Sequence, residues 1–191
     1  MSIKLITVER FSLVSRKPFE EVMAVITAAI GRPNMQLFQQ EIAAAETEAT
    51  LKELVQKAIG ASDLMEFMRL DMGIISRKRT GGIGRQTVRL IVGNPLIMTQ
   101  MVERVPDAAS YAPVTILVDE RPDGVHVSYD RVASFLAAYE DKEALTIAED
   151  LDAKVEKLLT AAATCMDSNH DKVIQNPHFT PQSFRGDSHV T

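Results

Sequence analysis

The chain has 191 residues, a formal net charge of −5, and 46% hydrophobic residues, which is normal for one globular domain with a substantial core. Its acidic balance argues against a protein built for nucleic acid or anionic membranes, and the longest uncharged central run, residues 90–102, is too short and broken to span a bilayer. The N-terminus has no long apolar segment, and the single cysteine, Cys165, allows no intramolecular disulfide. We therefore expect a cytoplasmic protein.

The first third of the chain predicts one strand followed by helices. Residues 3–13 are rich in β-branched and apolar side chains, which favours a strand, and residues 18–31 show apolar spacing typical of a helix. Asn34 can cap a second helix, and a capping-box pattern begins at Thr50. The pattern over residues 34–60 therefore predicts a two-helix insertion.

The middle of the chain predicts four more strands, over residues 68–74, 87–92, 114–120 and 125–129. The glycine-rich turn at residues 80–84 would join the first two strands as a hairpin. Pro122, Asp123 and Gly124 supply the turn of the second hairpin.

Helical patterns follow both strand pairs. Gly93, Asn94 and Pro95 end an apolar run and open a helix over residues 96–105. Asp130 can cap a helix through Tyr139, and an apolar stripe over residues 144–162 predicts a longer final helix. Strands with helices gathered around them indicate an α+β domain over residues 1–165, followed by a polar tail over residues 166–191.

The order of these features closely resembles the core of the domain-of-unknown-function 302 family. The resemblance rests on the Gly93-Asn94-Pro95 corner, Val105-Pro106, Tyr111-Ala112-Pro113, the hairpin and Tyr129, and it covers residues 66–160 well and 3–31 weakly. It implies a curved antiparallel sheet of about five strands with helices packed on one face, similar to the TATA-binding-protein-like β-α-β(4)-α topology. The helices predicted over residues 34–60 are longer than the connection usual in that family. The basic hairpin at residues 77–85 stands where the family more often has a short helix and loop.

The first candidate site is a small-molecule pocket between the sheet and the helices. Arg89, Gly93 and Asn94 would supply its polar groups, because amides at a helix N-terminus can bind a carboxylate or phosphate. Its lining would be Met98, Met101 and Tyr129. The alternative is a strand-to-helix corner with a methionine-filled core.

The second candidate is an anion site formed by Arg77, Lys78, Arg79 and Arg85. No acidic residue occurs between Gly73 and Val102, although the chain is acidic overall. The loop has neither the P-loop nor the Rossmann glycine pattern. A solvated hairpin tip is the alternative interpretation.

The third candidate is His126, which could approach Asp119 or Glu120 across the hairpin as an acid–base pair. A cofactor-independent enzyme using His126 and Glu120 is the functional interpretation, and an exposed cross-strand polar pair is the alternative. We assign no catalytic residue from sequence, and the histidine spacing predicts no metal site and no cofactor. The expected partners are a small-molecule ligand and a second copy of the chain, with no nucleic acid and no membrane. A homodimer assembled through the two-helix insertion is the third functional alternative.

Overall fold

The computed structural model describes residues 3–164, so the polar tail predicted at residues 166–191 lies outside the described residues. Five strands form one antiparallel sheet in the order β1-β5-β4-β3-β2. Their bounds are β1 Arg10–Ser15, β2 Met65–Asp71, β3 Thr87–Gly93, β4 Val114–Arg121 and β5 Gly124–Asp130. The prediction of an α+β fold with a five-stranded antiparallel sheet is confirmed.

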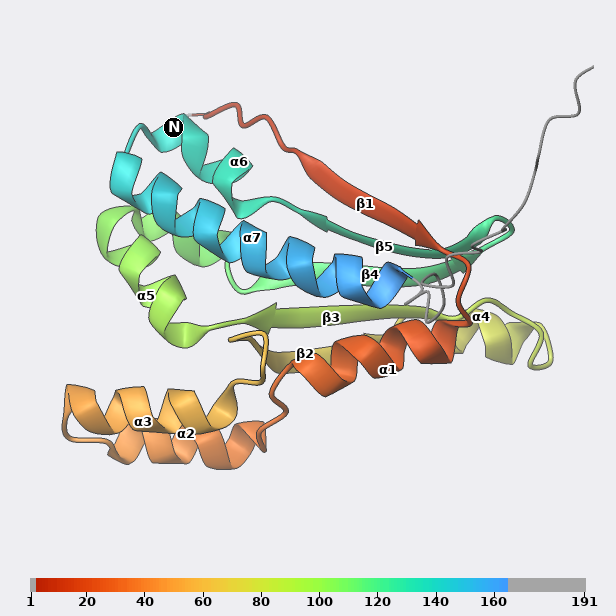
Figure 1. The fold of residues 1–191 in the computed structure, drawn as a ribbon, viewed down its shortest axis with the longest axis horizontal. Coiled ribbons are helices and arrows are strands. Elements are labelled where there is room, and N and C mark those ends of the chain that lie inside the picture. Colours follow the sequence, from red (N-terminus) through yellow and green to blue (C-terminus); the bar gives the residue numbers. More distant parts are fainter. Residues whose placement is uncertain (1–2, 165–191) are drawn as a thin grey trace, which may run out of the picture.

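Helices cover one face of this sheet, with α1 and α7 lying over it (Figure 1). Their bounds are α1 Phe19–Ala29, α2 Met35–Ala44, α3 Glu48–Ala58, α4 Ile74–Arg79, α5 Pro95–Arg104, α6 Val132–Leu136 and α7 Lys142–Ala163. The stripe of α7 includes Ala144 and Ala148, both fully buried, and such small side chains allow the helix to lie close to its neighbours. The two helices predicted over residues 34–60 are α2 and α3, which extend away from the sheet (Figure 1).

Strand alternation separates the two faces of the sheet. The side chains of β4 and β5 that face the helices are buried, namely Val114, Ile116, Val118, Val125, Val127 and Tyr129. The intervening side chains lie on the opposite face, which we call the open face, namely Thr115, Leu117, Asp119, His126, Ser128 and Asp130. Paired residues share a face, so Arg89 of β3, opposite Leu117, belongs to the open face as well.

Several element boundaries differ from the sequence prediction. The first strand begins at Arg10, not at residue 3. Asn34 caps α2 as predicted, since its side chain accepts a 3.0 Å hydrogen bond from Leu37 N. The cap of α3 is Thr47, whose hydroxyl accepts from Thr50 N, so the expected cap at Thr50 was three residues late.

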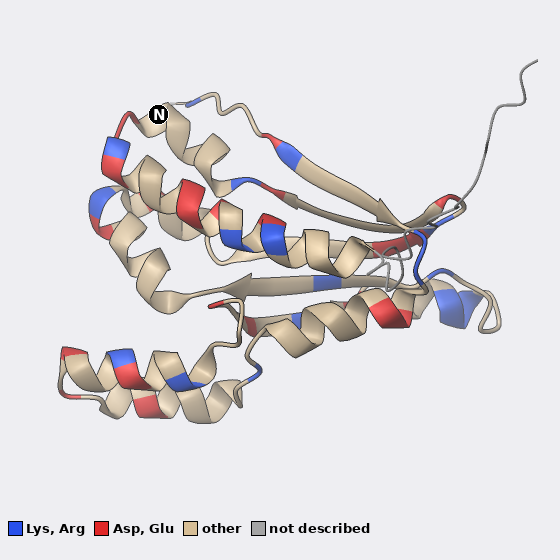
Figure 2. Ribbon diagram, in the orientation of Figure 1, with Lys and Arg blue, Asp and Glu red and all other residues tan. Residues whose placement is uncertain are grey.

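The prediction of a basic hairpin over residues 77–85 is wrong in its first part. Residues 77–79 belong to the helix α4 and not to a turn between two strands. Strand β2 ends at Asp71, whose carboxylate accepts a 3.0 Å hydrogen bond from Gly73 N and pairs with Arg77. These contacts turn the chain into a helix that is predominantly basic (Figure 2). The segment thus forms a short helix and loop, and the departure that the resemblance implied here is wrong. No helix within residues 3–164 is long and apolar enough to cross a membrane.

Candidate functional site

A groove of about 540 Å³ lies on the open face, beside the end of β5. We call it the sheet-face groove. Its lining comes from four strands, from the segment before β4 and from α6: Arg10, Arg89, Ser110, Tyr111, Pro113, Thr115, Leu117, Ser128, Tyr129, Asp130 and Phe135. This volume lies within the range of small-molecule sites. With two arginines and one aspartate, the lining has a formal charge of +1, although the whole chain is acidic.

Arg89 is the groove's cation without a carboxylate partner. It makes no ion pair within the described residues, and its guanidinium reaches only Thr115 Oγ1, at 3.4 Å. Arg10, in contrast, holds Asp130 through two hydrogen bonds of 2.7 and 2.9 Å. Ser128 is only 8% exposed, and its hydroxyl makes no hydrogen bond within the described residues. Arg89 and Ser128 therefore retain hydrogen-bonding capacity that a ligand can use.

An aromatic pair forms one wall of the groove. The rings of Tyr111 and Phe135 stack at 4.6 Å between centroids, with an interplanar angle of 9°. The Tyr111 hydroxyl lies 2.9 Å from the Tyr139 hydroxyl, which fixes the outer edge of its ring. A flat, rigid aromatic surface of this kind favours a planar ligand group.

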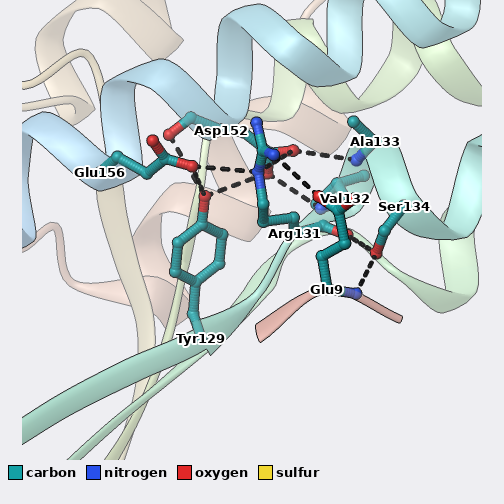
Figure 3. Close-up of polar contacts among 8 residues, drawn as sticks. All are labelled: Glu9, Tyr129, Arg131, Val132, Ala133, Ser134, Asp152 and Glu156. Atoms are coloured by element: carbon teal, nitrogen blue, oxygen red, sulfur yellow. Dashed lines mark hydrogen bonds and ion pairs between the residues drawn. The ribbon is translucent and has the colours of Figure 1, made fainter. Parts of the chain in front are cut away.

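The position of this aromatic pair depends on a buried carboxylate, that of Asp152, on the helix side of β5 (Figure 3). Asp152 of α7 is fully buried, and its two carboxylate oxygens accept hydrogen bonds from Val132 N at 2.9 Å and Ala133 N at 3.0 Å. These are the first amides of α6, which otherwise has no side-chain cap. Asp152 therefore fixes the helix that carries Phe135.

A polar network surrounds Asp152 (Figure 3). Arg131 Nη1 lies 2.8 Å from Glu9, and Arg131 Nε lies 3.0 Å from Glu156 as an ion pair without hydrogen-bond geometry. The Tyr129 hydroxyl donates to Asp152 and Glu156, each at 3.3 Å. The network ties the segment before β1 to β5, α6 and α7.

Burial dominates the protonation of this network. It raises the pKa of Asp152 above its ordinary value, against the two amide donors and Arg131, which lower it. Burial and the neighbouring carboxylates raise the pKa of Tyr129, so this hydroxyl stays protonated. The polar groups of this network interact mainly with one another through hydrogen bonds and ion pairs. We therefore interpret the network as structural support for the groove.

Of the six ligand residues expected from sequence, two line the groove and four lie in the packing. Arg89 lines it with its side chain. Tyr129 also borders the groove, but its side chain faces the helices, where its hydroxyl donates to Asp152. Asn94 Oδ1 accepts from Leu96 N at 2.9 Å and its Nδ2 donates to Asp63 O at 3.0 Å, so both ends of this side chain hold the corner. A Cβ at Gly93 would lie 3.0 Å from Pro113 Cβ. Met101 is fully buried, and Met98 packs beside the same core.

The structure also separates the expected acid–base pair. His126 Nε2 lies 2.9 Å from Asp123 Oδ1 on the open face. Glu120 has the opposite strand parity, and its carboxylate accepts from Gln86 N at 2.6 Å. No group of histidine, cysteine or carboxylate side chains within residues 3–164 could hold a metal ion.

Sequence reasoning missed the groove's hydroxyls and its aromatic wall. Thr115 and Ser128 alternate with buried aliphatic residues on β4 and β5, which is a signal that they face away from the core. Nothing in that alternation says that their face has no helical cover. Tyr111 and Phe135 lie in separate segments and meet only through the tertiary fold.

Comparison with known proteins identifies the family without an activity. No curated protein matches the chain significantly. A solved structure described as an uncharacterized conserved protein DUF302 from Bacillus stearothermophilus is similar, with a TM-score of 0.54, 10% identity and coverage of 81% of this chain and 98% of that one. At that identity the likeness shows the fold alone. The family model for the domain of unknown function DUF302 matches residues 11–162, and the chain therefore belongs to the DUF302 family.

Proposed function

We propose that the protein binds a small, planar anion in the sheet-face groove, with an aromatic carboxylate as the best-matched chemical class. The observation that carries this proposal is Arg89, which points into an open groove and has only a 3.4 Å contact with Thr115. A carboxylate can accept two parallel N–H bonds from a guanidinium. Such a pair gains orientation as well as energy.

The other groove residues complement an anion with a flat apolar body. Ser128 can donate its hydroxyl to the same carboxylate, while Tyr111 and Phe135 offer a rigid apolar surface. Asp130 would repel an anion, but Arg10 holds it through two hydrogen bonds. The groove thus favours an anion over a cation.

Calorimetric titration with benzoate tests this proposal. We expect wild-type protein to bind benzoate, and Arg89→Gln to weaken binding at least tenfold, or about 1.4 kcal/mol, because the charge-assisted pair is lost. The control is Arg16→Gln, which removes an equal charge from an exposed site outside the groove. Benzamide, which has the same ring without the charge, should bind weakly to all three proteins.

Two results would contradict the proposal. Equal benzoate affinity in wild type and Arg89→Gln would remove this arginine from any binding role. No heat of binding to wild type, even at millimolar benzoate, would reject aromatic carboxylates as the ligand class. We propose no reaction, since His126 and Glu120 lie on opposite faces of the sheet.

A further inference from the structure

A second surface lies on α4 and its flanking residues, which we call the α4 tip and define as residues 72–85. It holds Arg77, Lys78, Arg79 and Arg85 and no acidic residue, in a chain whose net charge is −5. Arg77 pairs with Asp71. The other three cations are exposed and make no ion pair within the described residues. The tip is therefore locally cationic.

The α4 tip also exposes large apolar side chains. Ile75 is 71% exposed and Ile83 is 82% exposed, and Met72 and Ile74 are exposed beside them. A single exposed hydrophobic residue needs no explanation, but a cluster of four within one short segment indicates a contact surface. Exposed basic side chains alone would be explained by their contribution to solubility. Exposed isoleucines lower solubility, so they need a different explanation.

Local geometry combines the two kinds of side chain. Ile75 lies three and four residues before Lys78 and Arg79, so the three share one face of α4. The following loop is tied back to the helix, because Gly82 N donates to Arg77 O at 2.8 Å and the Thr80 hydroxyl donates to Ile83 O. A surface hollow of about 430 Å³ lies beside them, lined by Ile75, Ser76, Arg79 and Thr80.

The tip lies at one end of the molecule (Figures 1 and 2). The helix α6, which carries the aromatic wall of the groove, lies at the other end (Figure 1). Contact at the tip would therefore leave that wall uncovered.

We propose that the α4 tip docks onto the surface of a bilayer that contains anionic lipids. Ile75 and Ile83 enter the boundary between headgroups and acyl chains, and Lys78, Arg79 and Arg85 contact lipid phosphates. Nucleic acid would match the cations but not the isoleucines, and free phosphate likewise gives the isoleucines no partner. The net charge that argues against a membrane partner is an average over the chain, whereas the field at a surface depends on nearby charges.

Co-sedimentation with lipid vesicles tests the proposal. We expect wild-type protein to sediment with vesicles of phosphatidylcholine and phosphatidylglycerol but not with phosphatidylcholine alone, and added salt should release it. Lys78→Glu with Arg79→Glu should reduce binding by more than about tenfold, since each basic residue near an anionic surface contributes roughly a fivefold affinity gain. Ile75→Ser with Ile83→Ser should also abolish sedimentation while leaving the net charge unchanged.

Matched variants on the insertion serve as controls. Lys52→Glu with Lys57→Glu makes the same charge change on α3, and Leu37→Ser removes an exposed apolar side chain from α2. Both should sediment like wild type, and circular dichroism melting should show that all variants are folded. Equal sedimentation of wild type with both vesicle types, or with neither, would overturn the proposal. Retained binding by the isoleucine variant would also overturn it and leave a simple anion site, which inorganic phosphate should then occupy and stabilise in a melting experiment.

Discussion

The two faces of the sheet use the same strands for different purposes. On the helix side of β5, each oxygen of the Asp152 carboxylate has an amide donor, and the Tyr129 hydroxyl donates to Asp152 and Glu156. On the open face, Arg89 and Ser128 also lie on paired strands, β3 and β5, but their polar atoms lack comparable partners. Polar groups that already have hydrogen-bond partners in the protein indicate a structural role. Polar groups in a groove that lack such partners indicate a binding role.

The largest expected effect comes from Asp152→Ala. It leaves the amides of Val132 and Ala133 without their acceptor in the interior, so we expect a loss of about 3 kcal/mol in unfolding free energy. Urea denaturation measures this loss. Asp150→Ala, on an exposed position of the same helix, should change stability by less than about 0.5 kcal/mol. Equal effects of the two substitutions would deny Asp152 its role as the cap of α6.

A smaller effect is expected at the Gly93-Asn94-Pro95 corner. Asn94→Ala removes the cap of α5 and the bond to Asp63 O, so it should cost about 1–2 kcal/mol. Asn34→Ala, which removes an exposed cap from α2, should cost about 1 kcal/mol or less. Benzoate affinity should be unchanged in both variants. Its loss in Asn94→Ala would place the binding site at the corner, as the sequence-based hypothesis has it.

The smallest expected effect is a pH dependence. Because burial raises the folded-state pKa of Asp152, the folded protein binds more protons than the unfolded chain just above the ordinary value of 3.8. This group's contribution to stability is therefore present at low pH and lost as pH rises through the folded-state pKa. Asp152→Asn has no such proton, so its stability deficit relative to wild type should shrink as pH rises. Urea unfolding of both proteins across this range measures the deficit, and a deficit that grows would show that the amide donors outweigh burial.

Much of the fold follows from local sequence signals. Asn34 caps α2 where the sequence predicts it, the Gly93-Asn94-Pro95 corner opens α5 as expected, and the alternation over residues 114–129 gives the hairpin and its two faces. These features depend on residues within a few positions of one another, so one sequence suffices to find them.

The misses share a different physical origin. Asp130 was expected to cap the helix after β5, but the cap is Asp152 of α7, which lies twenty residues beyond Val132, whose amide donates to it. Asp71 stops β2 by accepting from Gly73 N and pairing with Arg77, and the basic segment then forms α4. The homodimer through the insertion stays a prediction. Within residues 35–59, Leu37 is the only large hydrophobic residue that is exposed, so the insertion offers little apolar surface for such a contact.

The candidate site was predictable only in part. Arg89 stands out because it is a charged residue in an apolar strand, and it does line the groove. Met101 and Gly93 stand out for reasons of packing, and sequence alone does not separate a methionine-lined pocket from a methionine in the core. Which face of a sheet is left open is a property of the assembled helices.

Chemical-shift mapping of amide resonances during a benzoate titration tests the central claim most directly, because it locates binding on one face or the other. The account predicts that the largest shifts occur at Arg89, Thr115 and Ser128, with little change at Asn94 and Met101. Shifts concentrated at Asn94, Met98 and Met101 would contradict it, because they would place the ligand between the sheet and the helices and make the open face a bare surface.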